Sequence, residues 1–283
     1  MTDRPRTVVD YTSEITDIAK ETLLYIATTL GDLLNQIVLV GGLVPSLILP
    51  EKPDVPSHVG TMDVDLALSL GLLNSQRYTE VSSRLRKAGF KPDTNLEGNP
   101  TRQRWVIKVA GKPPGKVDFL IQQSDSKASA GSQQNLEADF AAIITPGVHL
   151  AFQDMLEISL DGQTIKGETA KRSIQVSGPG AYVVLKALAV RGRNEPKDSY
   201  DLQYVLRYYG DDPDDVVSRL TPLIDDPVTT EALSFLSEDF QAITSIGPSR
   251  AAEFLGTPED ADFKADVVGT VRELLKKCGK DSS

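Results

Sequence analysis

The first regular pattern of hydrophobic positions lies between residues 13 and 34. These positions recur every three or four residues, which predicts an amphipathic helix with one buried face. They are Ile15, Ile18, Leu23, Ile26, Leu30 and Leu33. Ser13 stands where a helix N-cap is expected. The next run, "QIVLVGG" at 36–42, is continuously apolar up to its two glycines and predicts a short buried strand, with a brief helix after it in "LVPSLIL" at 43–49.

A different pattern, strict alternation, begins at Thr61 in "TMDVDLALSL". Met62, Val64, Leu66 and Leu68 share one face, and Asp63, Asp65, Ala67 and Ser69 share the other. This period of two predicts a strand. A helix is expected at 75–88, closed by Gly89. The segments "RWVIKV" and "GKVDFLI" are expected to be two strands of a hairpin joined by the turn "AGKPPG".

The pattern changes character along the rest of the chain. Residues 122–135 are polar and predict a flexible loop, and the apolar pieces near 147–160 and 172–177 predict further strands. From Pro179 onward amphipathic helices alternate with proline-containing turns. We therefore predict an α/β (α+β) fold, with a mixed sheet and flanking helices in a domain 1–177 and a helical bundle in a domain 178–283.

The net charge of −10 is concentrated in the C-terminal part of the 283-residue chain. From residue 211 onward there are 16 acidic and 7 basic residues, whereas the first 210 residues hold 24 and 23. A broad nucleic-acid-binding face is therefore not expected in the C-terminal part. A local basic patch in the earlier part and ordinary solvated strand edges both fit one set of cations, namely Arg102, Arg104, Lys108, Lys112 and Lys116.

The composition also bears on the compartment. A single cysteine, Cys278, excludes a disulfide framework within the chain and a cysteine zinc site. No apolar run approaches 18 residues, and the first residues lack the apolar stretch of a signal peptide. We therefore expect a cytoplasmic protein that does not associate with membranes.

Two carboxylates interrupt the alternating strand, and their placement indicates chemistry. Asp63 and Asp65 are two residues apart, so they point to the same face at a spacing of roughly 6 to 7 Å. Their desolvation and mutual repulsion would cost several kcal/mol without compensation. Divalent magnesium would compensate both, because it prefers carboxylate oxygens and substrate phosphates. Asp118 interrupts a second apolar strand, and if the strands are neighbours the three carboxylates converge as two-metal phosphoryl transfer requires.

The glycine pair before this strand suits the phosphate side of such a site. Gly41 and Gly42 end a strand, and backbone N–H groups exposed there can hold phosphate oxygens. The hydroxyl of Ser46 is a further phosphate contact, and that of Thr61 can reach a phosphate or a metal-bound water. Each feature alone has an ordinary explanation, such as a turn or a solvent-facing strand edge.

The order of these motifs resembles the nucleotidyltransferase superfamily that includes DNA polymerase beta. The pattern there is an apolar strand, Gly-Gly or Gly-Ser, D-x-D, and a third aspartate on a later strand. The corresponding segments are "VLVGG", "TMDVDLAL" and "KVDFLI". This chain departs from the pattern by inserting "EKPDVPSHVG" between the glycines and the aspartates. It also has Ser57, His58 and Val59 where many members carry an arginine.

A second segment narrows the resemblance. "VLKALAVRGRNEPKDSYDLQYVL" is similar to AbiEii-type toxins of abortive-infection and toxin–antitoxin systems, in which a helix lysine and a following aspartate face the nucleotide. Carried over, the lysine is Lys186 and the aspartate is Asp198 or Asp201. Considered without the resemblance, Lys186 fits an ordinary solvent-exposed lysine on a helix equally well. Arg191, Arg193 and Lys197 read as surface charges, with Arg191 or Lys197 as a possible partner for Asp201. Neither His58 nor His149 is assigned a role, and Trp105 is expected in the core.

The resemblance implies an enzyme that transfers a nucleoside monophosphate from a nucleoside triphosphate, ATP or another, to an acceptor hydroxyl. Two Mg²⁺ ions would be bound by Asp63, Asp65 and Asp118, and the triphosphate by Gly41, Gly42, Ser46, Thr61 and Lys186, with Asp198 or Asp201 supporting Lys186. A tRNA acceptor and a cognate antitoxin are implied partners. Two alternatives stay open: a nucleotide- or partner-binding module without turnover, and a transferase that acts on a small molecule.

Overall fold

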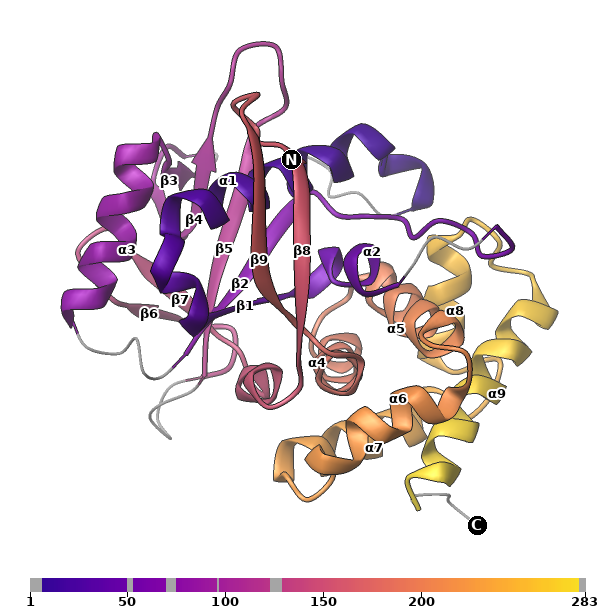
Figure 1. Ribbon diagram of the computed structural model, residues 1–283. Coiled ribbons are helices and arrows are strands. Elements are labelled where there is room, and N and C mark those ends of the chain that lie inside the picture. The colour runs from indigo at the N-terminus through magenta and orange to yellow at the C-terminus, as the bar shows by residue number, and fades with distance from the viewer. Residues whose placement is uncertain (1–6, 50–52, 70–74, 96, 123–128, 280–283) are drawn as a thin grey trace. The chain divides into compact units, whose positions relative to one another are not determined.

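The computed structural model describes residues 7–49, 53–69, 75–95, 97–122 and 129–279 (Figure 1). The chain divides into two compact units. The sheet unit consists of Ser13–Val44 and Gly60–Ser177, and the helical unit consists of Met1–Thr12, Pro45–Val59 and Gly178–Ser283. The domains 1–177 and 178–283 stay a prediction.

The sheet unit is built on a mixed β-sheet. Its strands are β1 (Ile37–Val40), β2 (Asp63–Leu68), β3 (Lys91–Thr94), β4 (Pro100–Ile107), β5 (Gly115–Ile121), β6 (Gln133–Asn135), β7 (Ala141–Ile144), β8 (Met155–Gln163) and β9 (Thr169–Ser177). The order is β3-β4-β5-β2-β1-β9-β8, with β7 beside β5 and β6 beside β7. Among the described strands, the pairs β1–β9, β2–β5 and β5–β7 are parallel and the others antiparallel, which confirms the predicted α/β class.

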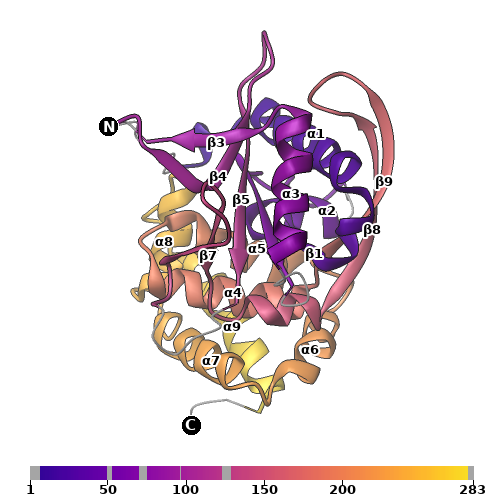
Figure 2. The ribbon, with the colours of Figure 1, turned by 90° about the vertical axis from the view of Figure 1, so that its left-hand side faces the viewer.

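Helix α1 (Ser13–Leu30) covers the sheet along the hydrophobic stripe that the sequence predicts, and contacts β2, β5, β8 and β9. The 3₁₀-helix η2 (Gly31–Gln36) continues it. Helix α3 (Ser75–Ala88) packs beside α1 (Figure 2) and ends at Gly89, whose φ of 96° supplies the left-handed stop that the sequence predicts. Two more 3₁₀-helices, η3 (Gly41–Leu43) and η5 (Val148–Phe152), complete the helices described in this unit.

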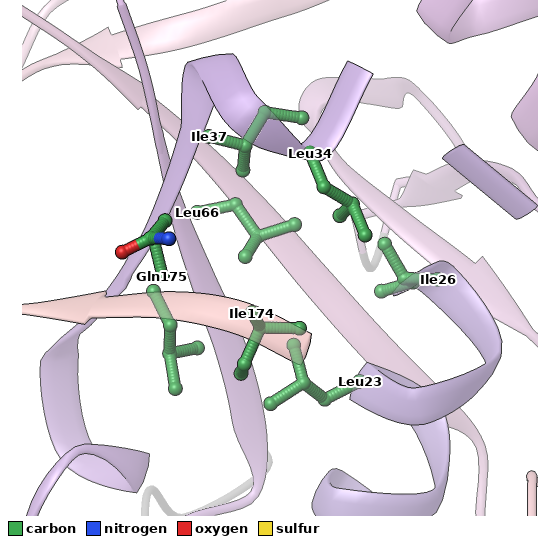
Figure 3. A pocket seen from close by; sticks show the side chains of 8 residues that line it. Leu23, Ile26, Leu34, Ile37, Leu66, Ile174 and Gln175 are labelled. Atoms are coloured by element: carbon green, nitrogen blue, oxygen red, sulfur yellow. The ribbon is translucent and has the colours of Figure 1, made fainter. Parts of the chain in front are cut away.

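A small apolar pocket lies between α1, η2 and the sheet (Figure 3). Its lining is aliphatic except for one amide, and consists of Leu23, Ile26, Leu34, Ile37, Leu39, Leu66, Ile174 and Gln175. None of these side chains is titratable, and none is a predicted site residue. The pocket is a gap in core packing that offers no group for chemistry.

The helical unit contains η1 (Val8–Asp10), α2 (Pro45–Ile48), α4 (Pro179–Gly192), α5 (Pro196–Tyr208), α6 (Pro213–Leu220), η6 (Thr221–Leu223), α7 (Pro227–Asp239), α8 (Ile246–Phe254) and α9 (Ala261–Lys277). Helices α4 to α7 each begin with a proline in the first turn, where its missing N–H costs nothing. The side chains of Asp212, Asp226 and Asp260 cap α6, α7 and α9. The prolines therefore start helices as well as separating them.

Two predictions of local structure are wrong. The loop expected at 122–135 contains strand β6. Its residues are polar and pair with β7 through backbone hydrogen bonds, so the sequence shows no hydrophobic pattern there. Residues 123–128 lie outside the described residues. The strand expected near 147–160 begins only at Met155, because Val148–Phe152 forms η5. The β4–β5 hairpin, the short helix α2 and the buried position of Trp105 are confirmed. In the described part of the chain, no helix combines the length and the apolar character needed to cross a bilayer.

Candidate functional site

The pairing of β2 with β5 brings the three predicted carboxylates together. The two strands are parallel neighbours, and Asp65 is in register with Asp118. Residues in register share a face, and so do residues two apart on one strand. Asp63, Asp65 and Asp118 therefore lie on one face of the sheet, as the sequence predicts if these strands are neighbours.

Arg104 belongs to the same face and binds two of these carboxylates. It is in register with Asp118 across the antiparallel β4–β5 pair. Its Nε donates to Asp118 Oδ1 at 2.8 Å and its Nη2 to Asp118 Oδ2 at 2.5 Å, a bidentate pair. The same Nη2 donates to Asp63 Oδ2 at 2.9 Å. We call these four residues, Asp63, Asp65, Arg104 and Asp118, the carboxylate face.

One guanidinium does not satisfy the acidic groups of the carboxylate face. Burial raises the pKa of Asp63, the Arg104 charge opposes this effect and the Asp118 charge adds to it, so the pKa stays above its usual value. The pKa of Arg104 is raised, first by its hydrogen bond to Asp118. The Oδ1 atom of Asp63 is buried and accepts no hydrogen bond. The face thus keeps a desolvated carboxylate oxygen toward which a cation would be drawn.

Gly41 brings the backbone against the carboxylate face. Its φ is 78°, a conformation that favours glycine. A Cβ at this position would lie 2.0 Å from Asp65 Oδ2. Gly42 follows as a buried residue of η3, and the Asp63 N–H donates to Thr61 Oγ1 at 3.5 Å. The glycine therefore serves both the turn after β1 and the close approach to Asp65.

The donor set of the carboxylate face suits a hard divalent cation such as Mg²⁺. It offers carboxylate oxygens on one face, and one of them is buried without a partner. As the side chains stand, the described residues contain no cluster of three His, Cys, Asp or Glu side chains placed to hold a metal ion. The Arg104 guanidinium already takes both oxygens of Asp118 and one of Asp63.

The second group of predicted residues forms a buried charge network in the helical unit. Lys186 Nζ on α4 donates to Asp198 Oδ1 at 2.8 Å and to Asp201 Oδ2 at 2.7 Å, both on α5. Lys197 Nζ donates to Asp201 Oδ1 at 2.6 Å, and Arg193 makes a bidentate pair with Asp198 at 2.7 and 2.9 Å. The Lys186 side chain is only 6% exposed, so it is not the solvated helix lysine of the alternative reading.

The inserted stretch before β2 contributes His58 to this network. Its Nε2 lies 2.9 Å from Asp201 Oδ1, and its Nδ1 lies 3.2 Å from Ser46 Oγ. A carboxylate only accepts, so we assign the proton to Nε2, and Nδ1 accepts from the Ser46 hydroxyl. The ring also stacks on Tyr200. Tyr204 donates its hydroxyl to the Pro56 carbonyl at 2.7 Å, which ties the insert to α5.

The network fixes its own protonation states. Burial alone would raise the pKa of Asp201, but Lys186 and Lys197 outweigh burial and lower it. Burial alone would lower the pKa of Lys186, but Asp198 and Asp201 keep it raised. Burial lowers the pKa of His58 to about 4, against the pull of Asp201, so the imidazole is neutral near pH 7. These groups satisfy one another within the unit.

The predicted site residues are divided between the two units, and further residues contact them. Gly41, Gly42, Thr61, Asp63, Asp65 and Asp118 belong to the sheet unit, and Ser46, Lys186, Asp198 and Asp201 belong to the helical unit. The sequence places Arg104 and Asp118 on the two strands of the predicted hairpin, but only the observed register sets them opposite one another. His58 had no signal in the sequence, since 143 residues separate it from Asp201. Arg193 and Lys197, read as surface charges, are partners of Asp198 and Asp201, while Arg191 pairs with Glu238 and Asp239.

Comparisons with known proteins give one distant likeness. No protein-family model matches the chain, and no curated protein matches it. Among solved structures, one match is the crystal structure of an antigenic nucleotidyltransferase-like protein from Paracoccidioides brasiliensis. It is 15% identical with a TM-score of 0.43, over 84% of this chain and 94% of that one. At that distance no residue role passes from one protein to the other.

Proposed function

We propose that this protein is a metal-dependent nucleotidyltransferase, which moves a nucleoside monophosphate from a nucleoside triphosphate to an acceptor hydroxyl and releases pyrophosphate. One observation carries the proposal: Asp63, Asp65 and Asp118 share one sheet face against the Gly41 backbone. The buried Asp63 oxygen without a hydrogen bond supports it, because a purely structural carboxylate is expected to be satisfied.

In this proposal each of the three aspartates of the carboxylate face has a task. Asp63 and Asp65 hold the cations, and Asp118 completes their ligand set and orients the acceptor hydroxyl. Backbone N–H groups at Gly41 and Gly42 receive phosphate oxygens. When bound, two Mg²⁺ ions would neutralise the triphosphate and lower the pKa of the attacking hydroxyl. The hydroxyl of Thr61, which accepts from the Asp63 N–H, would contact a phosphate or a metal-bound water.

From the family resemblance we propose that Ser46 and Lys186 contact the triphosphate. For this contact Lys186 would exchange a hydrogen bond to Asp198 or Asp201 for a phosphate oxygen, and Ser46 would likewise exchange its bond to His58. Asp198 and Asp201 would hold Lys186 in its charged form, consistent with their hydrogen bonds to its ammonium group. From the same resemblance we propose a tRNA acceptor and a role as the toxin of a toxin–antitoxin or abortive-infection system. The near-neutral charge of the first 210 residues keeps a small-molecule acceptor as the competing substrate.

The Arg104 contacts favour a second candidate, a nucleotide- or partner-binding module without turnover. Arg104 already balances part of the charge of Asp63 and Asp118, so the face can be a structural ion-pair cluster. Calorimetry separates the two readings. Nucleotide binding without any release of pyrophosphate supports the module.

The proposed activity is tested by incubating the protein with each α-labelled nucleoside triphosphate, Mg²⁺, and either total RNA or a panel of hydroxylated small molecules. We expect transfer of label and release of pyrophosphate, both lost with a chelator and in the Asp63→Asn/Asp65→Asn variant. Asp266→Asn is the matched control, since this carboxylate is 65% exposed on α9. Absence of transfer under every condition would refute the enzyme, and transfer that persists in the double variant would refute the site.

A further inference from the structure

Arg104 lies where a cation is required on the carboxylate face, and the proposed reaction has no task for it there. Its guanidinium bridges Asp63 and Asp118 with three hydrogen bonds of 2.5 to 2.9 Å. Asp63 and Asp118 are therefore both engaged before any metal arrives. The arginine must move aside or be displaced if these carboxylates are to bind a divalent ion.

We propose that Arg104 is an exchangeable counter-ion, which holds Asp63 and Asp118 in the free protein and passes to the triphosphate when a metal–nucleotide complex binds. The divalent cation is then taken up together with its nucleotide and only weakly as a free ion. This inference rests on the proposed nucleotidyltransferase function.

The charges explain why the exchange needs the nucleotide. Three carboxylates and one guanidinium leave the face with a charge of about −2 when all are ionised. A free cation can bind these carboxylates only if the charge-assisted hydrogen bonds of Arg104 break. The guanidinium, whose side chain is 30% exposed, would then lie without a counter-ion beside the incoming positive ion, and this repulsion is a free-energy penalty. A triphosphate removes that penalty, because its oxygens match the planar donor fork of arginine as well as a carboxylate does.

The local structure allows the exchange. Arg104 stands on β4, directly across from Asp118, so its side chain stays beside the site whichever partner it takes. The Asp63 and Arg104 side chains are 27% and 30% exposed, so a rotation of the guanidinium opens no large buried surface. The Asp118 side chain is only 10% exposed, so we expect it to stay in place while the Arg104 side chain rotates.

The test is a binding cycle by calorimetry on the full chain. Free Mn²⁺, each of the four α,β-methylene nucleoside triphosphates, and the two together are titrated into wild type, Arg104→Gln and Arg104→Lys. Arg102→Gln is the matched control, because it removes the same charge two positions away on β4, from a guanidinium that reaches Asn135 instead. Thermal unfolding of each variant checks that it is folded.

In Arg104→Gln we expect free Mn²⁺ to bind about 10- to 100-fold tighter and the metal–nucleotide complex to bind about 10- to 100-fold weaker, the range of one hydrogen bond to a charged group. The coupling between metal and nucleotide then falls accordingly. Arg104→Lys is expected to be intermediate, and Arg102→Gln to match wild type. Mn²⁺ affinity that is unchanged or lower in Arg104→Gln would overturn the exchange while nucleotide binding and transfer stand. Absence of metal and nucleotide binding in every protein would overturn the proposed function and, with it, this inference.

Discussion

The carboxylate face and the buried charge network use the same residue types in opposite ways. In the network, Asp201 receives hydrogen bonds from Lys186, Lys197 and His58, and its side chain is 1% exposed. On the carboxylate face, Asp63 has one arginine contact, a second oxygen without a partner and 27% exposure. The directions of the pKa shifts follow this difference: lowered for Asp201 and raised for Asp63. A carboxylate whose oxygens all accept hydrogen bonds within the protein stabilises the fold, whereas a carboxylate with an oxygen that accepts none is available for a ligand.

The largest effect is expected where the satisfied cluster is broken. Asp201→Asn leaves Lys186 and Lys197 buried without their shared counter-charge, which should cost about 3–5 kcal/mol of unfolding free energy. Urea unfolding followed by circular dichroism measures it. Asp266→Asn on exposed α9 is the control, with a change within about 0.5 kcal/mol. Equal effects at both positions would show that the network adds no stability.

Gly41→Ala should damage the carboxylate face through the backbone. The left-handed φ and the contact with Asp65 together predict a loss of about 2–3 kcal/mol and of nucleotide transfer, because Asp65 must shift. Gly98→Ala separates the two causes, since Gly98 has a φ of 83° but nothing within 4 Å of the added methyl. That control should lose only about 1 kcal/mol in thermal unfolding. A similar loss in both variants would mean that Asp65 tolerates the methyl group.

A pH series should detect His58 in the network. Its folded pKa of about 4 lies below the ordinary value of 6.5, so its contribution is fully present above pH 6.5 and is lost as the pH falls toward 4. Between pH 7.5 and pH 5 this amounts to about 2 kcal/mol. Urea unfolding at the two pH values should show the loss in wild type and in His149→Gln, and a smaller loss in His58→Gln. The same loss in all three proteins would place the titration elsewhere.

The smallest effect is expected for Asp63, with a sign opposite to that of Asp201. Asp63→Asn removes a desolvated charge that has only part of its hydrogen bonding, so the variant without metal should match wild type or gain up to about 1 kcal/mol. Thermal unfolding in the presence of a chelator measures this. A loss approaching that of Asp201→Asn would mean that Asp63 is a structural partner of Arg104, as the binding-module reading requires.

The sequence predicts those elements whose hydrophobic residues form a pattern. The stripe of α1 and the alternation of β2 are visible because water and core select different residues on their two faces, whereas β1 and the β4–β5 hairpin are visible as apolar runs ended by glycine or proline. Strand β6 has the sequence Gln-Gln-Asn and is held by backbone bonds to β7, so no side-chain pattern announces it. The 3₁₀-helix η5 is as apolar as a strand and too short for periodicity to distinguish the two.

The carboxylate face follows the same rule, because D-x-D on a strand fixes its own geometry while the partners of each group depend on register and on distant segments. Asp118 could be named because it interrupts an apolar strand, whereas its pairing with Arg104 depends on the register of the hairpin. His58 reaches Asp201 only after the inserted stretch packs on Tyr200 and Tyr204. Nothing local to His58 encodes that contact.

Because of the register between β2 and β5, the site depends on whether an even or an odd number of residues is inserted in these strands. Asp65 faces Asp118 only because an even step along a strand keeps a side chain on its face. One residue inserted in β5 just before Asp118 would turn it to the face of Val117 and Phe119, and a second inserted residue would turn it back. Length changes in the turn between β4 and β5 carry no such penalty as long as the pairing of the strands is kept. In evolutionary terms, this chain can vary the turn freely, but within the strand it can gain or lose residues only in pairs.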